Sequence, residues 1–158
     1  KNTYLTVAKL LDYGFDKDKI YNNLYDNFSE DRMRLLGFSL CEKMEVIHEY
    51  NTAIISLKKE ELKKYNFRHG DSENFVNYPL SIKDVRFSAL FIEKKDLIKI
   101  SFRSKGNFAV NKFAVKHFNG GGHLNAAGGE SYTTMEETLQ KFRDLLPENK
   151  DRLTSNEI

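Results

Sequence analysis

The chain has 158 residues, of which 40% are hydrophobic and 30% charged, with a formal net charge of +2 at pH 7. These values are typical of a soluble protein with one domain, or with one domain and an attached helical piece, and no segment reaches the roughly 18 apolar residues of a membrane span. The single cysteine, Cys41, excludes a disulfide framework and a cysteine metal site, so we expect a cytoplasmic protein. Residue 1 is Lys, and acids occur within the first twenty residues; we therefore expect no signal peptide and a piece of a longer chain.

Residues 1–50 have the apolar spacing of helices. The first predicted helix ends near Gly14, and a short second helix follows through Ile20 and Leu24. Ser29 is the predicted N-cap of a third helix of about 18 residues, with acids in its first turn. Its apolar stripe, at three- and four-residue steps, consists of Met33, Leu36, Leu40, Met44 and Ile47. We predict that both methionines lie in the core.

From Thr52 onward, the pattern favours strands mixed with helices. Strands are expected at 52–58, 85–93 and 97–103, the last two as a hairpin, with a short strand at 131–133. Helices are expected at 60–66, at 108–118 and after the capping box of Thr134 and Glu137, ending at Pro147. Between them, the irregular segment 68–82 carries His69, a residue we interpret as part of a solvated loop. The predicted fold class is α/β, with a mixed sheet of about five strands, flanking helices and an all-helical segment before it.

Residues 97–129 contain five basic side chains, two histidines and no Asp or Glu. Side chains alternate between the two faces of a strand, so Lys99, Ser101 and Arg103 share one face of the segment 97–103. This pattern is typical of a strand with one wet face, and it would also present a basic row to an anion.

The segment FNGGGHLNAAGG, residues 118–129, lies in the same acid-free window. Successive N–H groups of a glycine-rich bend can converge on an anion, and a helical turn starting at His123 would add its own N–H groups. We therefore favour an anion site over a simple turn. Its predicted residues are Arg103, Ser104, Gly120, Gly121, Gly122 and His123, with Lys99, Lys105 and Asn125 as further candidates. We expect no catalytic residue and no metal ligand in this chain.

The glycine–histidine segment resembles the signature of the DHH-associated domain, the C-terminal half of DHH-family phosphoesterases. The stretch KISFRSKGNFAVNKFAVKHFNGGGH is similar to the region that leads into this signature. YDNFSEDRMRLLG and GDSENFVNYPLSI resemble the oligoribonucleases (nanoRNases) that also dephosphorylate 3′-phosphoadenosine-5′-phosphate (pAp), some of them called exopolyphosphatase-related. The resemblance implies a helical end of the catalytic lobe and linker at 1–50, the DHH-associated domain at 51–147 and a polar, frayed tail at 148–158.

In that family, an N-terminal lobe with an Asp-His-His motif binds two Mn²⁺ ions, and the C-terminal lobe holds the substrate. No Asp-His-His triplet occurs in this sequence, so the resemblance implies a chain that is inactive alone. It also implies that His123 and the backbone of Gly121 and Gly122 hold substrate phosphate, with Arg103 and Ser104 as further contacts. The implied partners are short RNA oligonucleotides or pAp and the DHH lobe of the same protein. The sequence leaves open whether two copies of the chain form a homodimer.

Two alternatives remain open from the sequence. The chain could be the binding lobe of a DHH hydrolase that acts on a cyclic dinucleotide, pyrophosphate or polyphosphate. It could also be a stand-alone nucleic-acid-binding module similar to the domain at the end of alanyl-tRNA synthetase. An Asp-His-His motif about 200 residues upstream would favour an enzyme.

Overall fold

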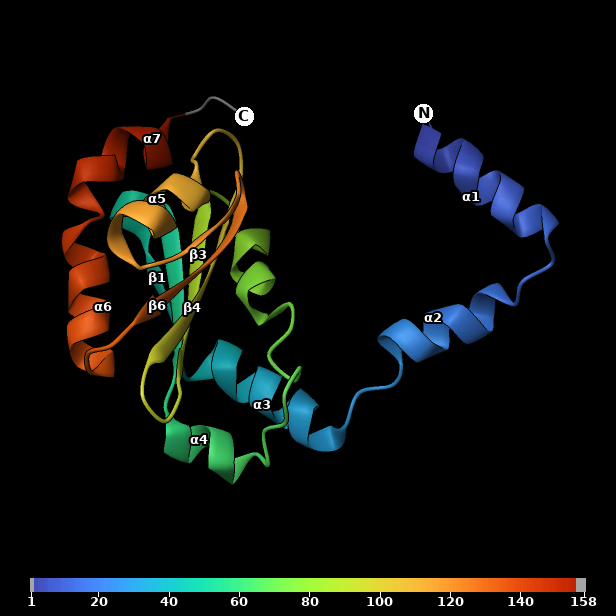
Figure 1. Ribbon diagram of the computed structural model, residues 1–158, viewed down its shortest axis with the longest axis horizontal. Coiled ribbons are helices and arrows are strands. Elements are labelled where there is room, and N and C mark those ends of the chain that lie inside the picture. Colours follow the sequence, from blue (N-terminus) through green and yellow to red (C-terminus); the bar gives the residue numbers. More distant parts are fainter. Residues whose placement is uncertain (1, 156–158) are drawn as a thin grey trace.

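The computed structural model describes residues 2–155 (Figure 1). Its helices and strands are α1 (Asn2–Asp12), α2 (Lys17–Tyr25), α3 (Glu30–Cys41), β1 (Met44–Ile47), η1 (His48–Tyr50), β2 (Thr52–Leu57), α4 (Lys59–Lys64), η2 (Phe75–Ser81), β3 (Phe87–Glu93), β4 (Ile98–Ser104), α5 (Val110–His117), β5 (Gly121–His123), β6 (Ala126–Ser131), α6 (Met135–Asp144), η3 (Pro147–Asn149) and α7 (Lys150–Thr154). The expected α/β fold with a helical N-terminal segment is confirmed.

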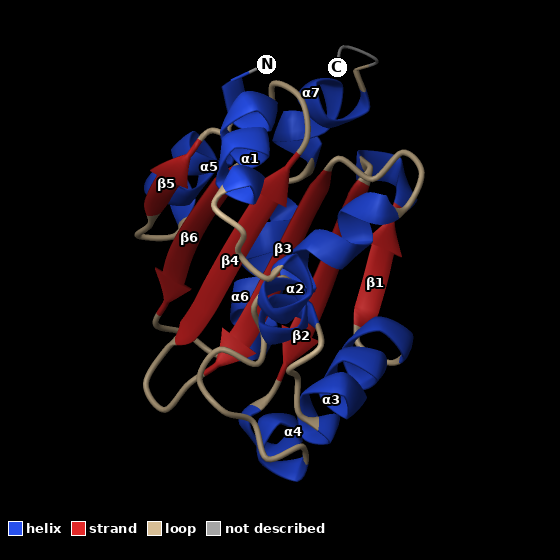
Figure 2. Cartoon of the chain, turned by 90° about the vertical axis from the view of Figure 1, so that its right-hand side faces the viewer, coloured by secondary structure: helices blue, strands red, loops and turns tan. Residues whose placement is uncertain are grey.

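The described strands form one mixed sheet in the order β1-β2-β3-β4-β6-β5 (Figure 2). β2 and β3 are parallel, and every other neighbouring pair is antiparallel. A parallel pair needs a crossover connection, and here residues 58–86 supply it with α4 and η2. The sheet has six strands rather than about five, because the sequence pattern missed the short strands β1 and β5. The strand expected at 131–133 lies earlier in the chain, as β6.

One face of the sheet is covered by α5, α6 and α7 over an aromatic core (Figure 1). Phe87 is fully buried and packs against four other phenylalanine rings, with centroid distances of 4.9–5.9 Å. Each fully buried Phe contributes roughly 1.5–3 kcal/mol relative to exposure. The helix expected after Thr134 is confirmed as α6, whose Met135 and Phe142 are buried here, as is Leu146 just beyond its end.

The opposite face is covered by apolar residues only over part of its width. α3 and η2 pack there on β2 and β3, where the second apolar cluster consists of Leu35, Leu36, Ile55, Leu57, Leu62, Phe75, Val76, Leu90 and Ile92. Farther along the same face, Lys99 and Gly128 are exposed, and Ser101 and Arg103 are half-buried. We call this part of the sheet surface, over β4, β6 and β5, the open face. Figure 2 shows the sheet from the side on which the open face lies.

The N-terminal helices stand apart from the sheet (Figure 1). α1 and α2 bury no residue, and their apolar side chains, such as Tyr4 and Leu24, are 82% and 60% exposed. The predicted helix end at Gly14 is confirmed by its φ of +69° and by its N–H, which donates to Leu11 O at 3.0 Å. No helix in residues 2–155 is long and apolar enough to cross a membrane.

The third helix is shorter than predicted. Its N-cap is confirmed, because Ser29 Oγ accepts from Arg32 N at 3.1 Å. However, the helix ends at Cys41, and the segment that continues its apolar spacing is strand β1. There, Met44 pairs with Ile55 of β2 and is partly buried. The prediction that Met33 lies in the core is wrong, since its side chain is 50% exposed.

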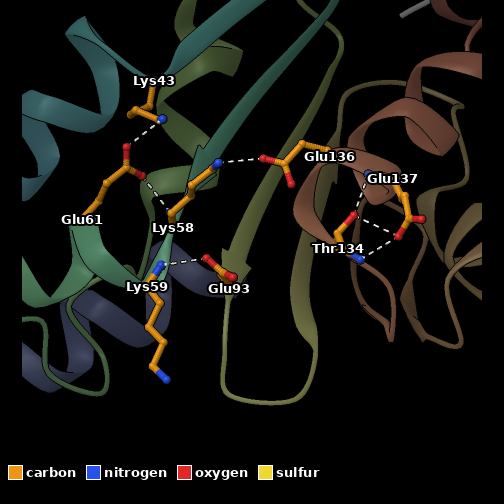
Figure 3. A network of polar contacts seen from close by, with 8 residues as sticks. All are labelled: Lys43, Lys58, Lys59, Glu61, Glu93, Thr134, Glu136 and Glu137. Atoms are coloured by element: carbon orange, nitrogen blue, oxygen red, sulfur yellow. Dashed lines mark hydrogen bonds and ion pairs between the residues drawn. The ribbon is translucent and has the colours of Figure 1, made fainter.

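The C-terminal helices are held to the sheet domain by apolar side chains in the aromatic core and by polar contacts. The capping box of α6 is confirmed, and beside it Lys58 Nζ lies 2.6 Å from Glu136 Oε1 (Figure 3). Such exposed pairs contribute little stability. The predicted frayed tail is instead helix α7 up to Thr154, because Leu153 is fully buried in the aromatic core. Residues 156–158 of that tail lie outside the described residues.

Candidate phosphate-binding site

The basic row of β4 lies on the open face, as the alternation predicted. Ile98, Ile100 and Phe102 are buried against the aromatic core, and the residues between them point to the other side of the sheet. Lys99 is exposed there, and Arg103 is half-buried, with its Nη1 donating to Phe102 O at 2.9 Å. A guanidinium has five N–H donors, so most of its donor capacity remains for a ligand.

A pocket of about 410 Å³ lies beside this row. Its other wall comes from the crossover between β2 and β3, in the loop before η2. The pocket is lined by Phe67, His69, Gly70, Ser72, Glu73, Asn74, Val76, Ile92, Lys94, Lys99, Ser101 and Arg103. Its lining therefore combines apolar side chains, cations and small polar groups, a mixture suited to a polar ligand with an aromatic part.

Positive charge predominates in the pocket. None of the ion pairs formed within residues 2–155 involves Lys94, Lys99 or Arg103. Burial lowers the pKa of Lys94, and the neighbouring charge of Lys99 lowers it further. Glu73 is the one acid among the lining residues of this pocket. An anion bound here would relieve the repulsion between the two lysines.

The glycine-rich segment folds as a β-hairpin rather than as the expected bend with a helical turn. β5 and β6 are joined by Leu124 and Asn125, and β5 is an edge strand of the sheet. The register aligns Arg103 with Ala126, and Ala126 with His123. Residues directly opposite in antiparallel strands share a face, so Arg103 and His123 both belong to the open face, with the small Ala126 between them.

The shared face does not make one shared pocket. His123 is exposed and is not among the residues that line the pocket beside β4. Two strand spacings separate it from Arg103, which corresponds to about 10 Å. The open face thus presents two cationic or hydrogen-bonding positions, one on each side of β6.

Two glycines of the hairpin are required by the packing of the strands themselves. A Cβ on Gly120 would lie 2.0 Å from Gly128 O, and Gly122 has a φ of +148° with Ala126 O 2.5 Å from its would-be Cβ. Gly121 and Gly128 differ, because a Cβ on either meets no atom closer than 3.6 Å. Both are exposed and paired with each other across the hairpin. Packing within the chain does not require glycine at these two positions. The absence of side chains there leaves the backbone accessible to a ligand.

Three predicted site residues form hydrogen bonds within the chain. Ser104 is 7% exposed on the aromatic-core side; its Oγ donates to Phe108 O at 2.7 Å and accepts from Asn125 Nδ2 at 2.9 Å. Asn125 Nδ2 also donates to Gly106 O at 2.9 Å. Lys105 Nζ donates to Leu80 O, away from the hairpin. Alternation along β4 turns the Ser104 side chain to the face opposite that of Arg103, so the two side chains do not lie together on the open face.

Several pocket residues were missed from the sequence. Alternation along β4 places Ser101 on the basic face with Lys99 and Arg103, and turns Ser104 away from it. His69 was interpreted as part of a solvated loop, and Ser72 and Asn74 carried no signal. Their approach to β4 depends on the path of the crossover, which sequence patterns do not specify.

His117 lies at the end of α5, on the other side of the sheet. Burial lowers its pKa, as does the charge of Lys116, while Glu148 acts in the opposite direction. The folded state therefore binds a proton at His117 less readily than the unfolded chain does. We expect the free energy of unfolding to fall as the pH drops below about 6.5, and the variant His117→Gln to lose part of that dependence. Urea unfolding at pH 7 and pH 5 tests this, and an identical pH dependence in both proteins would contradict it.

Comparison with known proteins gives a consistent result. Residues 49–149 match the sequence profile of the DHHA1 domain. The bifunctional oligoribonuclease and PAP phosphatase NrnA of Bacillus subtilis (strain 168) is 29% identical over 133 residues, which are 84% of this chain and 41% of the relative. The probable NrnA of Streptococcus mutans serotype c is 31% identical over 147 residues, 91% of this chain and 46% of the relative.

A solved structure is similar over almost the whole chain. The crystal structure of an exopolyphosphatase-related protein from Bacteroides fragilis is 49% identical, with a TM-score of 0.94, over 98% of this chain and 45% of that one. This chain spans less than half the length of the three proteins it matches here.

Proposed function

Because this chain belongs to the DHHA1 domain family, as its resemblance predicted, we propose that it is the substrate-binding lobe of a DHH phosphoesterase that degrades short oligoribonucleotides and dephosphorylates pAp. The observation that carries this proposal is the open face, where the cationic pocket of Lys99 and Arg103 adjoins a strip of bare backbone that ends at His123. The names of the two curated relatives support this choice of substrates.

In this proposal, the residues of the open face divide the recognition of a nucleotide between them. The planar fork of Arg103 suits two oxygens of one phosphate, and Lys99 adds a point charge. Gly121 and Gly128 let the substrate backbone approach the sheet closely. His123, about 10 Å from Arg103 across β6, holds a second phosphate by a hydrogen bond or, when protonated, by its charge. pAp carries two phosphates, one at its 3′ and one at its 5′ oxygen, and a dinucleotide with a 5′-phosphate also carries two, so each has one phosphate for either position.

The two Mn²⁺ ions implied by the resemblance do not fit this chain. Such ions need several carboxylate or imidazole ligands close together. Within residues 2–155, no three His, Cys, Asp or Glu side chains gather in a way that could hold a metal ion. We therefore assign to this chain only the capture and orientation of substrate, and place the metal centre on the N-terminal DHH lobe of the proposed whole protein.

The test is binding to the 158-residue chain itself. We expect pAp and a ribodinucleotide to shift the amide resonances of β4, β5 and β6, and Arg103→Gln to weaken the binding about 10- to 100-fold, as the loss of a charge-assisted hydrogen bond predicts. Arg152→Gln is the matched control, because it removes the same charge from α7 on the other side of the sheet. Equal losses in both variants, or shifts confined to other surfaces, would refute the proposal. Tighter binding of a cyclic dinucleotide or of polyphosphate would favour the alternative substrates.

A further inference from the structure

Arg32 is a buried cation without an acidic partner. It is 6% exposed on α3, and none of the ion pairs within the described residues includes it. Its Nη2 donates to Glu73 O at 3.1 Å. Its Cζ lies 3.6 Å from the centroid of the Phe28 ring and 5.5 Å from that of Phe75.

This environment compensates for the burial of the charge in an unusual way. An arginine is almost never buried unless it is paired, because desolvating a charge is costly. Here the compensation comes from two aromatic faces and one main-chain carbonyl. A guanidinium stacks well on aromatic rings and is weakly hydrated, whereas an ammonium is compact and strongly hydrated. The position is therefore specific for arginine rather than for positive charge.

The carbonyl that Arg32 binds belongs to the wall of the pocket. Glu73 and Asn74 both line the pocket, and the turn around them is closed by Glu73 N, which donates to Gly70 O at 2.9 Å. Asn74 has a φ of +70°, a left-handed conformation that a non-glycine residue holds only where its surroundings favour it. A second contact from α3 holds the segment before this loop, because Asn66 Nδ2 donates to Asp31 Oδ2 at 3.2 Å.

We propose that Arg32 is a positioning residue that fixes the pocket loop, residues 69–74, to α3 and, through Phe28, to the connection from the N-terminal helices. A movement of α2 relative to α3 would then move the ring that covers the guanidinium and loosen the loop opposite Arg103. The consequence for substrate rests on the proposed function above. The mechanical link itself rests only on the contacts of Arg32.

Amide hydrogen exchange of the 158-residue chain tests the link without any ligand. In Arg32→Gln we expect the amides of Glu73 and Phe75 to exchange about ten times faster, while those of β3 and β4 keep their protection. Arg34→Gln is the matched control on the same helix, since Arg34 is exposed and, among residues 2–155, forms its ion pair with Glu30. Arg32→Lys should not restore the protection of the loop. An unchanged loop, or an equal acceleration throughout the chain, would overturn the proposal.

Phe28→Ala provides a variant that keeps the arginine. Phe28 is 45% exposed, so its removal should leave the fold intact while uncovering one side of the guanidinium. We expect the same local acceleration at Glu73 and Phe75, weaker than in Arg32→Gln. If the amides of Glu73 and Phe75 kept their wild-type protection in this variant, the connection from the N-terminal helices would have no part in holding the loop.

The effect on substrate is measured separately. We expect Arg32→Gln to weaken the binding of pAp about tenfold relative to Arg34→Gln, because a mobile loop must be ordered on binding. Unchanged affinity despite a loosened loop would overturn the role in substrate binding. If the wild-type chain bound neither pAp nor a ribodinucleotide, the proposed function would fail while the exchange result would still decide the mechanical link.

Discussion

Replacing His123 by alanine in the proposed full-length phosphoesterase is expected to lower kcat/KM on a ribodinucleotide by about 10²–10³, with a nearly unchanged Tm. The side chain is exposed on an edge strand next to a two-residue turn, so its truncation leaves no cavity. Its proposed contact is with substrate phosphate at a site between two lobes, where removal of one hydrogen-bond donor to developing charge has effects of this size. The loss should appear in kcat/KM because free substrate is captured through the same contact.

His117→Ala is the control for this measurement. It also removes an imidazole from the acid-free window, but on α5, whose side chains pack against the aromatic core rather than on the open face. We expect its kcat/KM to stay within a few-fold of the wild-type value. If His123→Ala retained near-full activity, or if its activity fell only in proportion to a lower Tm, the histidine would have no part in substrate binding.

Gly122→Ala and Gly121→Ala are expected to separate stability from binding at adjacent positions. The first places a Cβ 2.5 Å from Ala126 O on a backbone with φ of +148°. We expect it to lower the free energy of unfolding by about 1–3 kcal/mol, the usual cost of overpacking or of a strained backbone. The second places a Cβ no closer than 3.9 Å to Val115 Cγ2, so its stability should change by less than about 0.5 kcal/mol.

For the affinity of the chain for its ligand, we expect Gly121→Ala to be the variant with the informative effect. If Gly121 provides backbone for close approach, Gly121→Ala should weaken the binding of pAp by the 158-residue chain while its urea unfolding curve stays that of the wild type. Full affinity in Gly121→Ala would exclude this part of the surface from the site. A Gly122→Ala chain as stable as the wild type would show that the hairpin can open without cost.

Local physics made much of this protein predictable from its sequence. The helix caps at Ser29 and Thr134 depend on side chains and N–H groups three residues apart, and such contacts form wherever the helix forms. The alternation in β4 placed Lys99, Ser101 and Arg103 on one face without any knowledge of the neighbouring strands. The family resemblance also came from contiguous motifs. These features share one property, namely that their determinants lie within a few residues of each other.

Features decided by distant partners could not be predicted in this way. Residues 44–47 continue the apolar spacing of a helix, yet they form β1 because residues 52–55 offer an antiparallel partner. The glycine-rich segment became an edge strand because β6 pairs with it and because Gly120 and Gly122 allow the two backbones to approach.

The candidate site likewise combines a local feature with one that depends on a distant segment of the chain. The basic row is local to β4, whereas the pocket also needs the loop of His69 and Glu73, which is 25 or more residues away in the sequence. The crossover between β2 and β3 and the contact of Arg32 with Glu73 bring that loop to β4. Only the tertiary structure determines that this loop and β4 lie together. The loop is held by packing and hydrogen bonds between segments far apart in the sequence, and a local sequence pattern treats such segments as independent.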